Sequence, residues 1–180
     1  MYQLYITDIP EKLKKDDITN YLLCIIDQFS KYGLAYIIQN KKAENILSCL
    51  KDFIIKNRIP QKIHTDNGKE FVNKLLIEYC INNNIIFLRE RPYHPQTQGC
   101  GEAFNKEIKR LLENKDKFAI NLVLPDILGI YNSNIHSTTK FAPKTLFYTV
   151  DNGADFNYFL LWRKMAKWRK SEEIAKSCEI

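Results

Sequence analysis

The chain has 180 residues, close to the usual size of one folded domain, and a domain of this size can bury a hydrophobic core without disulfides. Apolar residues make up 45% and charged residues 27%, and no apolar run approaches the roughly 20 residues of a membrane-spanning helix, so we expect a globular chain with no membrane partner. The 27 Lys and Arg residues exceed the 21 Asp and Glu residues, and the net charge of +6 suits a polyanionic partner without identifying one.

Cysteines and histidines give no sign of a structural metal. The five cysteines are odd in number and stand singly, and the three histidines are scattered, so we expect reduced thiols and no zinc. The N-terminus lacks the basic start and long apolar run of a secretory signal, which favours an intracellular location.

Five segments have the composition of β-strands. Residues 21–27 are continuously apolar, the pattern of a strand that is covered on both faces. The other strands are predicted at residues 2–7, 34–38, 62–65 and 85–88, each followed by turn residues.

Helical periodicity fills most of the intervals between these strands. Apolar residues recur at three- and four-residue steps over 43–56 and 71–81. A third helix is expected to start near Glu102 after a mobile loop over 91–101, and a fourth covers 122–136 with Pro125 in its first turn. Pro143 punctuates the connection that follows. This order predicts an α/β fold, a mixed sheet with helices packed on its faces.

The chain divides at about residue 150. Residues 1–150 are expected to form one domain, and residues 151–180 a basic amphipathic extension that contains Trp162 and Trp168. That extension is either a solvated terminal helix or a contact for nucleic acid.

Two acidic residues stand out by their context. Asp66 ends a predicted strand before Asn67 and Gly68, and Glu102 starts a predicted helix. Strand ends and helix starts converge at one edge of an α/β sheet, so the two carboxylates could hold a hard cation such as Mg²⁺ or Mn²⁺. Taken singly, the first is equally a turn residue and the second a surface residue that matches the helix dipole.

The residues around these two acids resemble the catalytic core domain of retroviral and retrotransposon integrases. The resemblance rests on the 35 residues between Asp66 and Glu102 and on three groups of residues: His64 to Gly68; Arg91 to Gly99; and Glu102 with Asn105. Weaker matches surround Asp27 and run from Tyr131 to Pro143. The family implies a ribonuclease H-like fold, a five-stranded mixed sheet flanked by helices. It also implies metal-dependent phosphoryl transfer on DNA, a homodimer and a nuclear location.

The resemblance implies three acidic ligands for two metal ions, because one ion activates the attacking oxygen and the other stabilises the leaving oxygen. Asp66 and Glu102 match the second and third acids as catalytic and metal-binding residues. The first aspartate is matched by Tyr5, whose phenol is neutral at pH 7 and cannot replace a bridging carboxylate. Asp8 lies three residues along the strand and therefore on its opposite face, whereas Asp27 is either a structural residue or a substitute ligand.

Six further residues are predicted to bind DNA: Asn67, Tyr93, Gln98, Asn105, Lys106 and Lys109; of these, Lys106 and Lys109 match DNA-contacting lysines of the family. Lys106 and Lys109 share a helix face with Glu102, so their ammonium groups could meet phosphates, or Lys106 could simply pair with Glu102. Tyr93 and Gln98 lie in the predicted loop, where an aromatic ring and an amide could contact DNA ends or merely keep the loop soluble. The sequence therefore predicts an integrase core with impaired chemistry or, alternatively, a non-enzymatic module for DNA binding or dimerisation.

Overall fold

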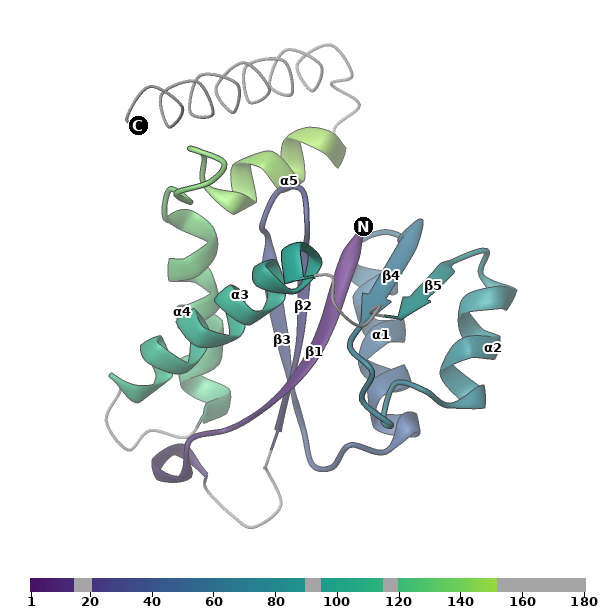
Figure 1. Ribbon diagram of the computed structural model, residues 1–180. Coiled ribbons are helices and arrows are strands. Elements are labelled where there is room, and N and C mark those ends of the chain that lie inside the picture. Colours follow the sequence, from purple (N-terminus) through teal and green to yellow (C-terminus); the bar gives the residue numbers. More distant parts are fainter. Residues whose placement is uncertain (15–20, 90–94, 115–119, 152–180) are drawn as a thin grey trace, which may run out of the picture.

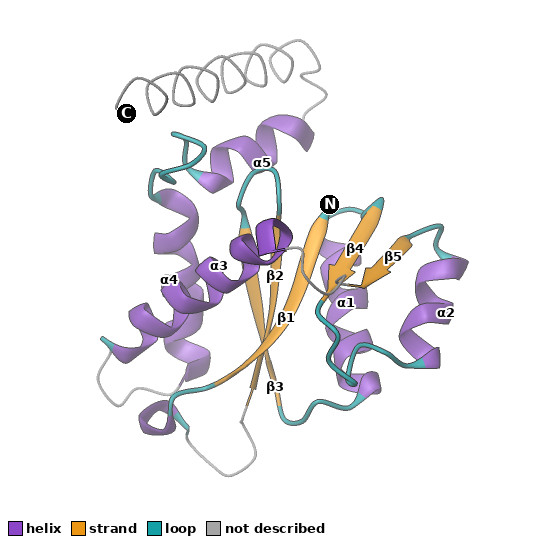
Figure 2. Cartoon of the chain, in the orientation of Figure 1, coloured by secondary structure: helices purple, strands orange, loops and turns teal. Residues whose placement is uncertain are grey.

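The computed structural model describes residues 1–14, 21–89, 95–114 and 120–151. Five strands form one mixed sheet in the order β3-β2-β1-β4-β5 (Figures 1 and 2). The strands are β1 (Tyr2–Asp8), β2 (Tyr21–Asp27), β3 (Gly33–Ile38), β4 (Lys62–Thr65) and β5 (Ile86–Arg89). β1, β2 and β3 are paired antiparallel, while β4 runs parallel to both β1 and β5. The predicted α/β fold with a five-stranded mixed sheet is confirmed.

Helices cover both faces of the sheet (Figure 1). α1 (Ala43–Lys56) and α2 (Lys74–Asn82) enclose one core with side chains such as Leu4, Ile25 and Ile63. α3 (Pro95–Glu113) and α4 (Ile120–Ser133) enclose a second core on the opposite face with Cys24 and Ile26. β2 contributes to both cores and all its residues after Tyr21 are buried, as its continuous apolar run predicted.

Near the N-terminal end of β1, a short helix closes the first core. α5 (Pro143–Asp151) stacks Phe147 on Tyr32 with ring centroids 4.2 Å apart, and the guanidinium of Arg58 lies over the Phe147 ring, 5.2 Å from its centroid. From the sequence, Pro143 was expected only to interrupt a connection. It is instead the first residue of α5, where its missing N–H costs no hydrogen bond.

The largest error of the sequence prediction concerns α3. The helix begins at Pro95, so the loop expected over residues 91–101 is wrong from Pro95 onward; residues 90–94 lie outside the described part of the chain. Proline suits the first helical position. Gly101 packs so tightly on the sheet that a Cβ there would lie 1.7 Å from Cε2 of Tyr5. This packing offsets the low helix propensity of glycine.

Two other helix boundaries differ from the prediction. α2 begins at Lys74 instead of residue 71, because Asn73 caps it by accepting a hydrogen bond from Leu76 N at 2.8 Å. α4 includes residues from Ile120 to Ser133, which places Pro125 inside the helix instead of in a first turn. The α1 and β4 bounds agree with the prediction at both ends.

No helix in the described ranges combines the length and the apolar character that crossing a bilayer requires. The predicted extension over residues 151–180 lies, after Asp151, outside the described residues.

Candidate active site and nucleic-acid interface

Tyr5 neighbours both of the elements that lead to the predicted acids, because it lies on the strand that pairs with β4 and packs against α3. The residue is 6% exposed, and its ring rests on the backbone of Gly101, the residue immediately before Glu102. Leu4 pairs with Thr65 across the parallel strands β1 and β4, so Tyr5 and Asp66 each lie one residue past this pair. The fold therefore places Asp66 beside Tyr5 along the sheet and Glu102 beside it along α3.

A tight turn holds Asp66 at the end of β4. Its Oδ1 accepts a hydrogen bond from Gly68 N at 2.9 Å, a turn that aspartate often makes with the residue two positions on. A Cβ on Gly68 would lie 2.8 Å from that oxygen and 2.8 Å from Oε2 of Glu70. A side chain at position 68 would displace one of these carboxylates, and Glu70 brings a second carboxylate to the turn that the sequence reasoning missed.

Glu102 projects from α3 into an open groove. The groove has a volume of about 680 Å³ and is shared by Glu102, Asn105, Lys106 and Lys109, together with Thr7 from β1. Four of the predicted site residues are therefore brought to one surface. The end of β1 and the basic residue Arg110 also line this groove, and neither was singled out from the sequence.

The charges along α3 are partly compensated. Arg110 forms two hydrogen bonds to Glu107, at 2.7 and 2.9 Å, and these lower the pKa of the Glu107 carboxyl. Burial raises the pKa of the Cys24 thiol to about 12, and the positive charge of Lys109 opposes this rise. The Lys109 ammonium is thus close enough to the sheet to act on a fully buried thiol of β2.

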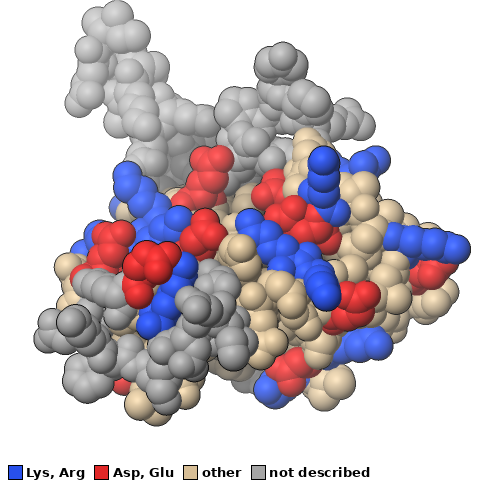
Figure 3. All heavy atoms as spheres, turned by 90° about the horizontal axis from the view of Figure 1, so that it is seen from below, with Lys and Arg blue, Asp and Glu red and all other residues tan. Residues whose placement is uncertain are grey.

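Figure 3 shows the molecule from below, where Lys and Arg side chains are interspersed with Asp and Glu side chains. The described surface on this face therefore carries no continuous field of one sign. Recognition of a polyanion would depend on individual cations such as Lys106 and Lys109, more than on the net charge of +6.

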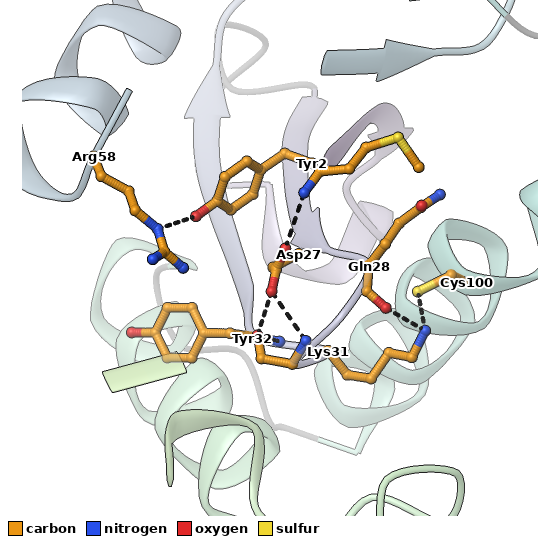
Figure 4. A network of polar contacts seen from close by, with 9 residues as sticks. Tyr2, Asp27, Gln28, Lys31, Tyr32, Arg58 and Cys100 are labelled. Atoms are coloured by element: carbon orange, nitrogen blue, oxygen red, sulfur yellow. Dashed lines mark hydrogen bonds and ion pairs between the residues drawn. The ribbon is translucent and has the colours of Figure 1, made fainter. Parts of the chain in front are cut away.

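Asp27 is directed away from Tyr5. It pairs with Tyr2 on β1, so its side chain lies on the opposite face of the sheet from that of Tyr5. There its Oδ2 accepts hydrogen bonds from Ser30 N at 2.9 Å and Ser30 Oγ at 2.8 Å, and Figure 4 shows this turn. Asp27 is therefore a turn-forming residue. Asp8 is excluded as well, because β1 pairs with β2 without a bulge and Asp8 falls on the face opposite Tyr5.

The remaining predicted residues are placed only in part. Asn67 is exposed in the turn after β4, and Gln98 lies within α3 instead of in a loop. Tyr93 lies outside the described residues. His64 is buried on β4 opposite Gln3, as expected for a packed histidine.

A metal site made of three ligands is not found. Within the ranges that the structure describes, no three His, Cys, Asp or Glu side chains gather closely enough to hold one ion. Asp66 and Glu102 offer the oxygen ligands that Mg²⁺ prefers, but Tyr5, which is next to Asp66 in the strand register and packs on Gly101, is a buried phenol.

The same fold occurs in solved integrase structures. The catalytic core domain of BIV integrase superposes with a TM-score of 0.70 at 20% identity, over 84% of this chain and 95% of that one. The HTLV-2 integrase catalytic core domain in complex with magnesium gives a TM-score of 0.66 at 19% identity, over 81% and 94%.

Sequence comparisons lead to the same group of proteins. The Pro-Pol polyprotein of feline foamy virus is 26% identical over 164 residues, which are 89% of this chain but 14% of the polyprotein. That of simian foamy virus type 3 is 24% identical over 76% of this chain and 12% of its own length. The chain thus spans a small part of these relatives. The family model of the integrase core domain matches residues 2–95, just over half of the 180 residues, and this chain therefore belongs to the integrase core domain family.

Proposed function

We propose that this chain is an integrase core domain that binds DNA for integration and whose phosphoryl-transfer chemistry is impaired at the first acidic position. One observation carries the proposal: a buried tyrosine, Tyr5, occupies the strand position between Asp66 and the helix that bears Glu102. Membership of the family is the reason to propose DNA as the substrate. The tyrosine at position 5 is the reason to propose that the chemistry is impaired.

The residues present do not fit a two-metal centre. The HTLV-2 core domain was solved with magnesium, and Asp66 and Glu102 would be the ligands here. Two ions need bridging carboxylates, and a phenol with an ordinary pKa near 10 carries no charge at pH 7. The Tyr5 ring also fills the space against Gly101, so an apolar packing contact stands where the family has a carboxylate.

The surface for DNA is the groove along α3. Lys106 and Lys109 supply ammonium groups for phosphates, and Asn105 supplies an amide whose Oδ1 is buried and has no hydrogen-bond partner in the described part of the chain. Asn67, on the turn after Asp66, adds a second amide, and Tyr93 and Gln98 complete the proposed contact set. We also propose a homodimer in the nucleus, as in the family; the HTLV-2 core domain has been solved in dimeric and trimeric forms.

The test restores the missing acid. We expect Tyr5→Asp to nick supercoiled DNA in Mg²⁺ or Mn²⁺, whereas the unsubstituted protein stays at background. Tyr5→Asn is the matched control and should also stay at background, because asparagine has nearly the same shape as aspartate but carries no charge. The double variant Tyr5→Asp with Asp66→Asn should lose the gain. Equal background in all four proteins would count against Tyr5 as the position of the first acid.

A non-enzymatic module is the second candidate, and the tight contact between Tyr5 and Gly101 favours it because the ring has become part of the core. Under this alternative, duplex DNA binding falls steeply with salt and no variant at position 5 gains cleavage. Strand joining by the unsubstituted protein in magnesium would exclude both the impairment and this alternative.

A further inference from the structure

Arg110 brings a third cation to the groove along α3. It lines the groove together with Lys106 and Lys109, and it lies one helical turn after Lys106. Four residues of an α-helix rise by about 6 Å, so the three cations are grouped within little more than one turn. The sequence analysis did not include Arg110 among the DNA-binding residues.

Arg110 differs from the two lysines because it already holds a carboxylate. Its Nε donates a hydrogen bond to Glu107 Oε2 at 2.9 Å, and its Nη2 donates one to Glu107 Oε1 at 2.7 Å. Neither Lys106 nor Lys109 forms an ion pair with a carboxylate in the described part of the chain. Two parallel bonds from one guanidinium are also the arrangement in which arginine binds a phosphate group. The Glu107 carboxylate therefore occupies the donors that a phosphate of DNA would use.

The pair between Arg110 and Glu107 lies where an exchange of partners costs little. The Arg110 side chain is 58% exposed and the Glu107 side chain is 39% exposed. Water and salt screen an exposed ion pair, so its net contribution to stability is small. Both side chains also line the groove itself, so a phosphate that enters the groove meets the guanidinium directly. A bidentate contact with that phosphate can then replace the contact with Glu107.

A second cavity gives the released Glu107 carboxylate a place away from the phosphates. Glu107 also lines a cavity of about 550 Å³ on the other flank of α3. Lys31 lines that cavity as well, and its Nζ donates hydrogen bonds to the carbonyl oxygen of Gln28 at 2.8 Å and to Cys100 Sγ at 3.2 Å (Figure 4). Glu107 thus lies between a groove with three cations and a cavity with a fourth, and rotation of its side chain moves the negative charge from one to the other.

We propose that Arg110 is a further phosphate-binding residue of the groove and that Glu107 competes with DNA for it. DNA binds by exchange: a backbone phosphate takes the place of the Glu107 carboxylate on the guanidinium, and the Glu107 side chain turns away. Glu107 therefore lowers the affinity of the groove for DNA. This inference rests on the proposed DNA-binding function and deepens it, because it adds one residue that binds the phosphate and one that opposes it.

Removal of the competing charge tests the exchange. Binding of the whole chain to duplex DNA is measured by fluorescence anisotropy over a range of salt concentrations. Glu107→Gln keeps the shape of the side chain and removes its charge, so we expect the affinity to rise roughly five-fold, the effect of one charge about 4 Å away in water. In an Arg110→Gln background no guanidinium is released, so the gain from Glu107→Gln should fall to about two-fold or less, the screened repulsion between Glu107 and DNA.

Variants of Arg110 and a control on another helix complete the experiment. With Gln at position 107, Arg110→Gln should lower the slope of log affinity against log salt by about 1. Arg110→Lys should keep the slope and lose part of the affinity, because an ammonium cannot form the bidentate contact. Glu78→Gln is the matched control, since Glu78 pairs with Lys74 on α2, across the sheet from the groove, and it should leave the affinity unchanged.

The outcomes separate this inference from the proposed function. Suppose that Lys106→Gln and Lys109→Gln weaken binding but Glu107→Gln behaves like the Glu78→Gln control. The groove then binds DNA, the exchange is overturned, and the pair only stabilises the helix. An equal gain from Glu107→Gln with and without Arg110 also overturns the exchange, because Glu107 then acts through its own charge alone. If the unsubstituted chain binds no duplex DNA, both proposals are wrong.

Discussion

The ring of Tyr5 and the backbone of Gly101 are in such close contact that a Cβ on the glycine would lie 1.7 Å from Cε2 and 2.2 Å from Cζ of the tyrosine. A side chain at position 101 and a ring at position 5 therefore exclude each other. The contact joins β1 to the first turns of α3, directly before Glu102.

We predict opposite effects of alanine at two glycines in α3. Gly101→Ala should destabilise the fold by about 1–3 kcal/mol, because it overpacks a buried contact. Gly99→Ala is the matched control: a Cβ there meets no atom within 4 Å, so the gain in helix propensity should stabilise the fold by about 0.5–1 kcal/mol. Urea unfolding measures both, and equal effects would contradict the packing.

The same contact predicts coupling between positions 5 and 101. In a Tyr5→Asp background the ring is gone, so Gly101→Ala should cost much less than in the unsubstituted protein. A double-mutant cycle of unfolding free energies measures this difference. Additive effects would show that the ring and the helix are independent.

DNA binding is expected to depend on individual lysines of the groove. Lys106→Gln and Lys109→Gln should each weaken duplex binding and lower the slope of log affinity against log salt by about 1. Lys74→Gln is the control, because Lys74 lies on α2, across the sheet, 3.6 Å from Glu78. A salt titration followed by fluorescence anisotropy distinguishes them, and a slope changed as much by Lys74→Gln would assign binding to another face.

His136 gives the fold a pH dependence of known sign. Its pKa is lowered below the ordinary 6.5 by burial and by the charge of Lys31, so the unfolded chain binds a proton more readily than the folded one. Stability from this residue is present above pH 6.5 and is lost as pH falls below that value. His136→Asn should therefore show a smaller loss of stability between pH 7 and pH 5 in thermal unfolding. An identical loss of stability in both proteins would show that His136 does not cause the pH dependence.

Asn132 should be one of the more costly positions to change. Its amide accepts a hydrogen bond from Gly33 N at 2.9 Å and donates one to Gly33 O at 2.8 Å, and both residues are buried. Asn132→Ala leaves two buried backbone groups without partners, and we expect a loss of about 2–4 kcal/mol. Asn132→Asp keeps the acceptor and loses the donor, so it separates the two bonds. A loss under 1 kcal/mol for the alanine variant would mean that water replaces the amide.

Helices and strands could be predicted from the sequence where the local pattern and the tertiary packing favour the same structure. α1 was predicted from end to end because its apolar period is regular and Pro60 follows it. β2 was recognised because a strand between two helical layers has no polar face. The start of α3 was missed because Gly99 and Gly101 disfavour a helix locally. The contact with Tyr5, which the sequence does not reveal, explains why position 101 is a glycine.

In the candidate site too, some features could be predicted from the local sequence and others depend on tertiary structure. The turn at Asp66 could be predicted because the Asp-Asn-Gly sequence determines it locally. The approach of Glu70 to Gly68 and the position of Lys31 over Cys100 could not, since each depends on side-chain directions. The Lys31 contact joins residues 69 positions apart. Tyr5 was identified as the exception by its place in the motif, but its burial against α3 came only from the structure.

The paired bonds between Asn132 and Gly33 also affect how sheets of separate molecules can meet. β3 is an outer strand, and an outer strand normally offers free amide and carbonyl groups to a strand of another chain. At Gly33 both groups are already taken by a side chain from α4. Lateral growth of the sheet is therefore blocked at this end of β3, and aggregation through that edge is opposed by a single amide.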